Sequence, residues 1–247
     1  MADQMTVSWK ILLAGIPITS SRGALGWSTV ALIQTGGHNL LVDTGSYGDR
    51  AQLLIALDKI ALPPEKIDGL FLTHFHYDHL LNFDLFPNAV IYLSAEEIKY
   101  VQGGGYQTAN DPFVPAALYP LLEGRIIPYS GDVELLPGVR TVPLPGHTPG
   151  MTGLLLDREG VLFAGDGIKN GHEFVKGQPP PVFGDSEDAL RSYQRGTELA
   201  QIIVPGHDNP FRLHQASTIE YLNSFSLDIV LADKPYEKPR TISLPFS

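Results

Sequence analysis

Three histidines and an aspartate share one short segment, THFHYDH at residues 73–79, and this motif constrains the chain more than any other feature. The chain has 8 histidines in total, so three within six positions argue against a chance cluster on a surface turn. The mostly apolar residues 67–72 predict a buried strand that leads directly into the motif. A tight turn after a strand can direct such side chains toward one point. Imidazole and carboxylate ligands suit Zn, Mn, Fe or Co. The first candidate metal ligands are therefore His74, His76, Asp78 and His79.

Three further candidate ligands follow predicted strands later in the chain. His147 lies in PGHTPG at residues 145–150, Asp166 ends the apolar run that begins at residue 162, and His207 follows residues 203–206. Each alone is more typical of a turn residue. Proteins with mixed α/β folds place their sites where strands end, so we expect these side chains to meet the first motif. Together they complete seven ligands, which is one set for two metal ions.

Composition excludes several other classes of protein. The absence of cysteine removes disulfides, thiolate ligands and a cysteine nucleophile, and it fits a cytoplasmic protein. A formal net charge of -10 argues against a nucleic-acid partner, which requires clustered cations. The sequence contains no run of 18 apolar residues, the length that would predict a membrane span. Residues 11–16 resemble a short signal-peptide core, but Asp3 stands where positive charge is needed, so a first strand is the better interpretation.

The remaining pattern predicts one domain, residues 1–247, with strands first and then alternating strands and helices, twice. The expected strands are 7–13, 30–34, 39–42, 67–72, 88–93, 133–136, 139–144, 152–157, 161–164 and 201–204. The expected helices are 49–60, 94–101, 185–200 and 215–225, the second with Ser94 and Glu97 at the spacing of a capping box. Residues 102–115 predict a long irregular loop. This order suggests a four-layer αββα sandwich, although pattern alone indicates only a mixed α/β fold.

From residue 30 to His207 the sequence resembles the metallo-β-lactamase superfamily of hydrolases. The resemblance rests on LVDTG at residues 41–45, the motif at 73–79, PGHTPG, Asp166 and the PGH that ends at His207. It implies the αββα sandwich and a particular assignment of ligands. In that assignment His74, His76 and His147 hold one ion, Asp78, His79 and His207 hold the second, and Asp166 bridges them. Asp43 orients imidazoles through hydrogen bonds.

The chemistry expected of such a centre is hydrolysis. Two divalent ions share a hydroxide at neutral pH. This bridging hydroxide attacks either the carbon of a carbonyl group or the phosphorus of a phosphoryl group. Asp78 is the best-placed protein group to protonate the leaving group. Zn is the favoured metal, with Mn, Fe and Co accommodated by the same ligands. The sequence contains no Gly-x-Ser-x-Gly elbow, the motif that would suggest a serine nucleophile instead.

Within the superfamily the sequence is most similar to N-acyl homoserine lactonases and related lactone or ester hydrolases. A bridging Asp166 speaks against true β-lactamases, and only 40 residues follow His207, fewer than the C-terminal domain of glyoxalase II requires. Lactonases of this kind carry a tyrosine three residues after the bridging aspartate, whereas this chain has Lys169. An ammonium there could stabilise an oxyanion or bind a carboxylate, or it could simply be solvated. Lys169 is therefore a candidate catalytic residue.

Other interpretations stay open at this point. A thioesterase or a phosphodiesterase could use the same two metals. A flavodiiron protein would have Glu in place of His76 and a flavin domain, and a metal-free binding module would have lost ligands.

We expect a small carbonyl substrate, recognised by residues 20–27, 103–113 and 172–183, and the chain could form a homodimer. The aromatic candidates for a pocket wall are Trp27, Tyr106, Phe113, Phe174 and Phe183, although for any single one a position in the core or at a dimer interface is the favoured interpretation. His38, His172 and His214 receive no role.

Overall fold

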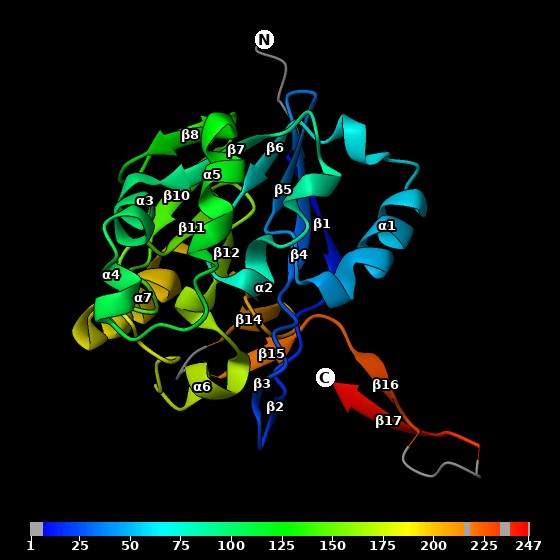
Figure 1. The fold of residues 1–247 in the computed structure, drawn as a ribbon. Coiled ribbons are helices and arrows are strands. Elements are labelled where there is room, and N and C mark those ends of the chain that lie inside the picture. The colour runs from blue at the N-terminus through cyan, green and yellow to red at the C-terminus, as the bar shows by residue number, and fades with distance from the viewer. Residues whose placement is uncertain (1–6, 215–217, 233–237, 247) are drawn as a thin grey trace.

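Two β-sheets packed face to face form the centre of the molecule (Figure 1), as the computed structural model describes it over residues 7–214, 218–232 and 238–246. The first sheet has the order β1 (Ser8–Leu13), β4 (Val30–Thr35), β5 (His38–Val42), β6 (Gly69–Phe71), β7 (Val90–Ser94) and β8 (Ile126–Tyr129). The second has the order β15 (Ile219–Tyr221), β14 (Phe211–Leu213), β13 (Ile202–Pro205), β12 (Val161–Gly165), β11 (Thr152–Leu156), β10 (Val139–Pro143) and β9 (Glu134–Leu136).

Helices cover the outer faces of both sheets. The α-helices are α1 (Arg50–Asp58), α2 (Tyr77–Leu80), α3 (Ala95–Gln102), α4 (Gly105–Thr108), α5 (Tyr119–Leu122), α6 (Gly171–Val175) and α7 (Ser186–Leu199). Short 3₁₀ turns join them: η1 (Tyr47–Asp49), η2 (Pro64–Lys66), η3 (Phe83–Leu85), η4 (Ala116–Leu118), η5 (Glu123–Arg125) and η6 (Asp166–Ile168). Buried residues of α1, α3 and α5 pack on the first sheet, whereas α6 and α7 pack on the second.

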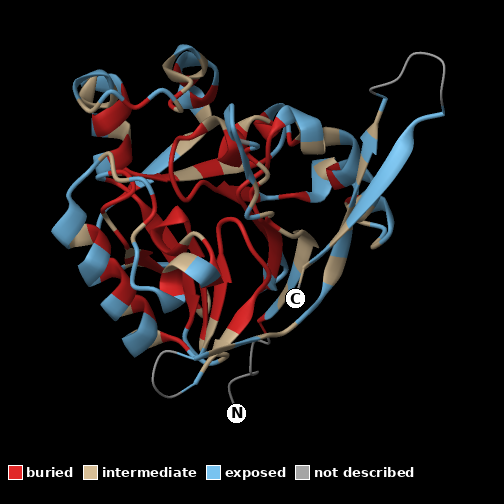
Figure 2. Ribbon diagram, turned by 90° about the horizontal axis from the view of Figure 1, so that it is seen from below, coloured by how far each residue is buried: buried red, intermediate tan, exposed pale blue. Residues whose placement is uncertain are grey.

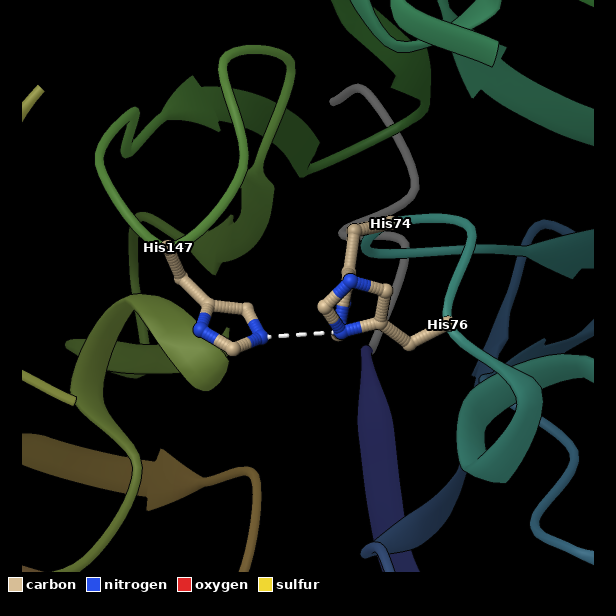
Figure 3. A group of neighbouring side chains, drawn as sticks. All are labelled: His74, His76 and His147. Atoms are coloured by element: carbon tan, nitrogen blue, oxygen red, sulfur yellow. Dashed lines mark hydrogen bonds between the residues drawn. The ribbon is translucent and has the colours of Figure 1, made fainter. Parts of the chain in front are cut away.

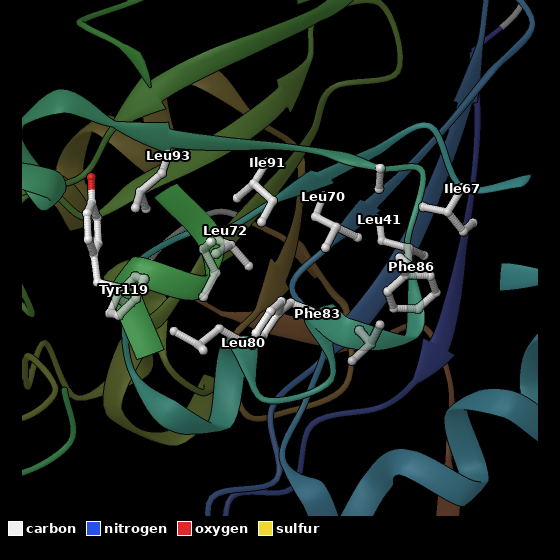
Figure 4. Close-up of a cluster of buried hydrophobic side chains, with 14 of the residues drawn as sticks. Leu41, Ile67, Leu70, Leu72, Leu80, Phe83, Phe86, Ile91, Leu93 and Tyr119 are labelled. Atoms are coloured by element: carbon white, nitrogen blue, oxygen red, sulfur yellow. The ribbon is translucent and has the colours of Figure 1, made fainter. Parts of the chain in front are cut away.

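Three hydrophobic layers separate these four layers of structure, and this confirms the expected αββα sandwich. Within β4, Val30 and Leu32 belong to the core beneath the outer helices, whereas Ala31 and Ile33 belong to the core between the sheets. Figure 4 shows part of the core beneath the helices, including Leu70 and Leu72. Alternate residues of a strand point to opposite faces, so an almost continuous apolar strand must be buried on both sides. Figure 2 shows the result, with buried strands in the middle and exposed helix surfaces at the periphery.

The strand directions bring several loops to one edge of the sandwich. In the first sheet β5 and β6 are parallel. In the second, β10 and β12 are both antiparallel to β11, and β13 is parallel to β12, so β10, β12 and β13 run in the same direction. The carboxyl ends of these three strands therefore lie at one edge, and each of them leads into a segment that holds a candidate ligand.

Two predictions of local structure are wrong. Of the helix expected over 215–225, residues 215–217 lie outside the described residues. The rest contains β15 and the first residue of β16 (Phe225–Leu231). Because β15 pairs with β14, Ile219 and Tyr221 lie on the same face of the strand and pack on the core of the second sheet. The loop expected over 102–115 also contains α4, which begins after Gly104 at φ +70°.

A hairpin near the C-terminus projects away from the sandwich (Figure 1). It consists of β16 (Phe225–Leu231) and β17 (Arg240–Phe246), which form a separate two-stranded sheet. A smaller pair, β2 (Thr19–Ser20) and β3 (Gly23–Ala24), precedes β4. No helix within the described residues is both long enough and apolar enough to cross a membrane.

Candidate metal centre

The side chains expected to bind metal converge at the edge where the strands end. Three groups have ligand atoms within 4.8 Å of one another: His74, His76 and His147; His74, His79 and Asp166; and Asp78, His79 and His207. All seven residues are buried. The first group is drawn in Figure 3, where its three rings, carried by two different loops, point toward one another. Ligand candidates up to 133 positions apart in the sequence thus share one site.

Asp166 lies between the first and the third of these groups, with one carboxylate oxygen on each side. Its Oδ1 is 3.4 Å from His79 Nε2 and 3.3 Å from His207 Nε2. Its Oδ2 is 3.4 Å from His147 Nε2. The two oxygens of one carboxylate therefore face the ligands of two different groups, which is the geometry of a bridging ligand.

Local structure explains how Asp166 and His207 reach the site. Gly165, the last residue of β12, has φ +51°, and a Cβ there would lie 2.8 Å from the side chain of Thr73. The glycine therefore lets the chain turn sharply into η6 with Asp166 as its first residue. Gly206 is similarly constrained, because a Cβ would approach Asp166 Oδ1 to 2.1 Å. Two glycines without room for side chains thus bring the ends of β12 and β13 together.

Asp43 orients two imidazoles, as the sequence resemblance implies. It follows β5 with φ +57°, a left-handed conformation that aspartate tolerates better than most residues. Its carboxylate accepts hydrogen bonds from Thr73 N, from Thr73 Oγ1 and from His79 Nδ1, at 2.8, 2.8 and 2.7 Å. Since Thr73 Oγ1 donates to Asp43, it accepts from His74 Nδ1 at 3.0 Å. The Nε2 atoms of His74 and His79 are left to face the site.

His76 and His147 use opposite ring nitrogens for the hydrogen bonds that orient them. His76 Nε2 donates to Asp111 at 2.8 Å, and His147 Nδ1 donates to the carbonyl of Pro181 at 2.6 Å. The remaining ring nitrogens, His76 Nδ1 and His147 Nε2, carry lone pairs and lie only 3.0 Å apart. Two lone pairs at this separation repel each other, and a cation between the rings would remove that repulsion.

Unsatisfied buried atoms test whether the site fits metal ions. Buried polar atoms are normally hydrogen-bonded, because an unpaired one costs about 1–3 kcal/mol. In the described part of the chain, four buried atoms at this site have no hydrogen-bond partner: His74 Nε2, His79 Nε2, His207 Nε2 and Asp166 Oδ1. Each is an atom that a metal would coordinate. The chemistry and orientation of these donors fit divalent metal ions.

The titration of the site is consistent with a cation. Burial, aided by His79 and other imidazoles, holds the pKa of His74 well below its usual value, and burial likewise lowers the pKa of His147. Both rings are therefore neutral and able to coordinate. Burial also disfavours charge on His79, but Asp43, Asp166 and Asp78 outweigh it and raise its pKa well above the usual value. The carboxylates around His79 thus attract positive charge, which a metal ion would supply.

Lys169 extends into the same site. Its Nζ lies 2.7 Å from Asp166 Oδ2, and its side chain is only 20% exposed, so it is not a solvated loop lysine. Burial opposes ionisation of Asp166, yet Lys169, His207 and His79 together hold the pKa of this carboxyl well below its usual range. Burial also disfavours the ammonium, but Asp166 raises the pKa of Lys169 above its ordinary value. The lysine therefore brings a fixed positive charge to the Asp166 carboxylate.

Two of the five aromatic residues considered for a pocket wall lie against the site. Phe113 and Phe183 have ring centroids 5.6 and 5.7 Å from that of His76 and 5.8 Å from each other. Phe174 is instead a core residue, packed between Tyr193 and Phe211. Trp27 and Tyr106 are half-buried, and Tyr106 packs on the core of the first sheet. His38, His172 and His214 are exposed.

Sequence patterns missed three polar residues that support the ligands. Asp111 and Tyr100 form a buried chain behind His76, because Tyr100 donates to Asp111 Oδ2 at 3.0 Å. Glu97 is buried beneath two of the ligand loops instead of closing the expected capping box. Ser94 does cap α3 by accepting from Glu97 N. Asp111 lies 35 residues from His76 in the sequence, and no local pattern links the two.

The fold and the candidate ligands together define a class of protein, an αββα sandwich with a buried site of histidine and aspartate side chains at one edge. Comparison with known families agrees: the model of the metallo-beta-lactamase superfamily matches residues 26–207. The chain therefore belongs to the metallo-β-lactamase superfamily. Its cofactors are divalent metal ions.

Several relatives are similar over most of the chain. An N-acyl homoserine lactonase from Bacillus sp. is 31% identical over 159 residues, which cover 62% of this chain and 60% of the lactonase. Metallo-beta-lactamase domain-containing protein 1 from Xenopus laevis is 31% identical over 188 residues, covering 75% and 72% of the two chains. The chain thus spans about three fifths of the length of that lactonase.

Solved structures share the fold. A mutant of Bacillus thuringiensis AiiA with bound N-decanoyl-L-homoserine matches with a TM-score of 0.58 at 24% identity, covering 73% of this chain and 80% of that one. AidC, a dizinc quorum-quenching lactonase, matches with a TM-score of 0.64 at 20% identity, covering 79% and 78%. These identities support the fold alone.

Proposed function

We propose that this protein hydrolyses a small lactone or carboxylic ester with two divalent metal ions. The observation that carries the proposal is the division of the Asp166 carboxylate, whose Oδ1 faces His79 and His207 while Oδ2 faces His147. Such a carboxylate would serve two metal ions at once, as in two-metal hydrolases, whose ions typically lie about 3.5–4 Å apart. We take residues 1–247 as a single catalytic domain.

The seven ligands divide into two sets in this proposal. His74, His76 and His147 would hold the first ion, and Asp78, His79 and His207 the second, with Asp166 shared. The hydrogen bonds of Asp43, Asp111 and Pro181 support these roles, because each leaves the inward ring nitrogen of a histidine free. Zn is the favoured metal for such a set of nitrogen and oxygen ligands, and Mn, Fe or Co are alternatives.

When bound, the two ions supply an activated water nucleophile and neutralise charge that develops on the substrate. The remaining steps fall to the side chains of this chain. The Lys169 ammonium can donate to a carbonyl oxygen as it becomes negative. Asp78 can take up the proton that the attacking water loses and pass it to the departing alkoxide. Phe113 and Phe183 form an apolar wall beside His76, which suits the carbon skeleton of an ester or lactone.

A lactone is the first choice of substrate because curated relatives at 29–31% identity are named N-acyl homoserine lactonase. Lys169, in the place where those lactonases typically have tyrosine, distinguishes this chain from them. An ammonium favours a substrate with greater negative charge near the scissile carbonyl than a neutral acyl homoserine lactone carries. A thioester or a phosphodiester on the same centre is the alternative.

Turnover of a matched substrate panel tests this choice. The panel contains neutral lactones, lactones that carry a carboxylate, thioesters and bis(p-nitrophenyl) phosphate, each assayed with the Zn-loaded and Mn-loaded protein. We expect the largest kcat/KM for a lactone or ester. Lactone turnover at the background rate, with thioester or phosphodiester turnover above it, would replace this proposal by its alternative.

The substitution Lys169→Met separates chemistry from packing, because methionine keeps the length of the side chain and removes its charge. Removing one donor to a developing oxyanion typically costs about 100-fold or more in rate, so we expect a fall of that order in kcat. Metal content measured on the same sample is the control, and it should stay at the wild-type value. An unchanged kcat would assign Lys169 to a structural role.

We also propose that the protein is cytoplasmic, which its lack of cysteine supports.

We further propose that it forms a homodimer through the β16–β17 hairpin. One face of this hairpin carries three successive apolar cross-strand pairs: Phe225 with Phe246, Leu227 with Leu244, and Ile229 with Ile242. A two-stranded sheet is only marginally stable alone, and few contacts join this one to the described body of the chain.

The proposed partner for that face is the same face of a second copy. A row of apolar pairs is self-complementary, as a two-fold contact requires. Light scattering of the eluted protein should give the mass of a dimer, and Leu227→Glu should give a monomer. Ser226→Glu, on the opposite face, is the matched control. A monomeric wild-type protein would contradict the proposal.

A further inference from the structure

Glu97 is a completely buried carboxylate that the proposed chemistry does not use. It lies in the first turn of α3 and is 0% exposed. Its Oε1 accepts a hydrogen bond from Phe75 N at 2.9 Å, and its Oε2 accepts from Thr148 Oγ1 at 2.7 Å and from Gly150 N at 3.1 Å. Burying a carboxylate without a cation is costly, so packing alone does not explain this residue.

The donors to Glu97 share one property: they belong to the two loops that carry the first group of ligands. Phe75 stands between His74 and His76, and Thr148 directly follows His147. These loops are about 70 residues apart in the sequence, as His76 and His147 are separated by 71 positions. A single side chain therefore fastens both loops to the same point.

Gly150 shows how closely the second loop is held against α3. A Cβ at this position would lie 2.1 Å from Glu97 N, so no side chain fits. Its carbonyl accepts from Ser94 Oγ at 2.7 Å and from Thr152 Oγ1 at 3.0 Å, while its N–H donates to Glu97. The end of the PGHTPG loop is thus fixed at both its donor and its acceptor.

The ligands of the second proposed metal position, Asp78, His79 and His207, are held by other residues. His79 is oriented by Asp43, the carbonyl of Asp78 accepts from Ser28 Oγ at 2.5 Å, and His207 N donates to the carbonyl of Lys169 at 2.7 Å. None of these bonds involves Glu97. The two proposed metal positions share the support of Asp43, which also orients His74 through Thr73. Glu97, in contrast, accepts only from Phe75, Thr148 and Gly150, which lie beside ligands of the first position.

We propose that Glu97 is a positioning residue that sets the distance between His147 and the pair His74 and His76, and thereby determines the affinity of the first metal position alone. This inference rests on the two-metal function proposed above. A carboxylate is suited to the task because each of its oxygens accepts from a different loop. Glutamine offers one oxygen and one NH₂ group, and that NH₂ group cannot accept from Gly150 N–H.

The test compares both metal affinities of Glu97→Gln with those of the wild type, by calorimetric titration of chelator-treated protein with Zn²⁺. We expect binding at the first position to weaken by about 10–100-fold, the usual cost of losing a group that supports a metal ligand. The second position should keep its wild-type affinity. His76→Ala, which removes a ligand of the first position only, identifies which binding event belongs to which position.

A control substitution has the same chemistry away from the ligand loops. Asp68 precedes β6, at the end of that strand away from the ligand motif, and its Oδ2 accepts from Asn39 N at 2.8 Å, so Asp68→Asn should leave both affinities unchanged. Thr148→Val removes one donor to Glu97 while leaving the carboxylate in place. It should weaken the first position selectively but by less, so the proposal stays testable even if Glu97→Gln folds poorly.

A second readout does not depend on metal or activity. Amide hydrogen exchange of the chelator-treated protein should be faster at Phe75 and Gly150 in Glu97→Gln, whereas amides of β12 should be unaffected. Equal weakening of both metal positions, or no weakening of either, would overturn the proposal. If the wild type itself bound no second metal, the proposed function would fail first, and the two failures are thus distinguishable.

Discussion

Replacing Asp166 by asparagine should lower kcat/KM by at least about 1,000-fold, because several kcal/mol of transition-state stabilisation are lost and each 1.36 kcal/mol is a factor of ten. Asparagine has almost the same shape, so the fold should persist. However, it is neutral and offers only one carboxyl-type oxygen, while Asp166 presents one oxygen to His147 and another to His79 and His207. The two metal positions would lose the group that they share.

The measurement pairs steady-state kinetics with metal analysis and circular dichroism of Asp166→Asn. Asp157→Asn is the matched control, because Asp157 is an exposed carboxylate paired with Arg140 far from the ligands. The control should keep wild-type turnover. An Asp166→Asn protein that folds and retains near-normal turnover would show that Asp166 has no bridging role.

Removing the metals with a chelator should abolish turnover, and adding back Zn²⁺ or Mn²⁺ should restore it. The same treatment should lower the thermal midpoint, since a ligand present at about 100 times its Kd adds about 2.7 kcal/mol of stability. For a chain of this size each 1 kcal/mol shifts the midpoint by about 2–4 °C, so a loss of roughly 5–10 °C is expected. The physical reason is the set of unsatisfied ligand atoms, His74 Nε2, His79 Nε2 and His207 Nε2, which a cation satisfies.

A magnesium-loaded sample is the comparison for specificity. Magnesium prefers oxygen ligands and octahedral geometry, so it should restore far less activity at a site rich in histidine. Turnover that survives exhaustive chelation would contradict metal-dependent hydrolysis by this protein.

The convergence of the seven candidate ligands is the part of the site that sequence could predict. His74, His76, Asp78 and His79 are close in sequence, and the other three each follow an apolar strand, so local patterns were enough to find them. Their convergence follows from strand direction, because β10, β12 and β13 run the same way. The resemblance to a known superfamily then supplied the four-layer arrangement.

The supporting residues could not be predicted, because their roles depend on contacts between distant segments. Glu97 has the spacing of a capping-box residue, yet its carboxylate turns inward to Thr148 and Gly150. Asp111 lies in a glycine-rich loop with no pattern of its own. The sequence also could not decide between a solvated and a site lysine at Lys169; the turn η6 decides it by placing Nζ against Asp166.

The C-terminal strands were missed for a similar reason. Apolar residues at 219, 222 and 225 fit a helix, while 219, 221 and 225 fit strands, so a short segment satisfies both periods. Pairing of β15 with β14 selects the strand, since Tyr221 then packs on Phe211 and its hydroxyl donates to Asp208 at 2.7 Å. Tertiary contacts at the sheet edge thus override the local pattern.

The metal content of the protein tests the central claim most directly. Protein purified without chelator, with zinc and manganese in the medium, should contain two divalent ions per chain by inductively coupled plasma mass spectrometry. Both should leave together with activity on dialysis against a chelator. A content below about one ion per chain, in protein that still turns over substrate, would contradict a dinuclear centre at His74, His76, Asp78, His79, His147, Asp166 and His207.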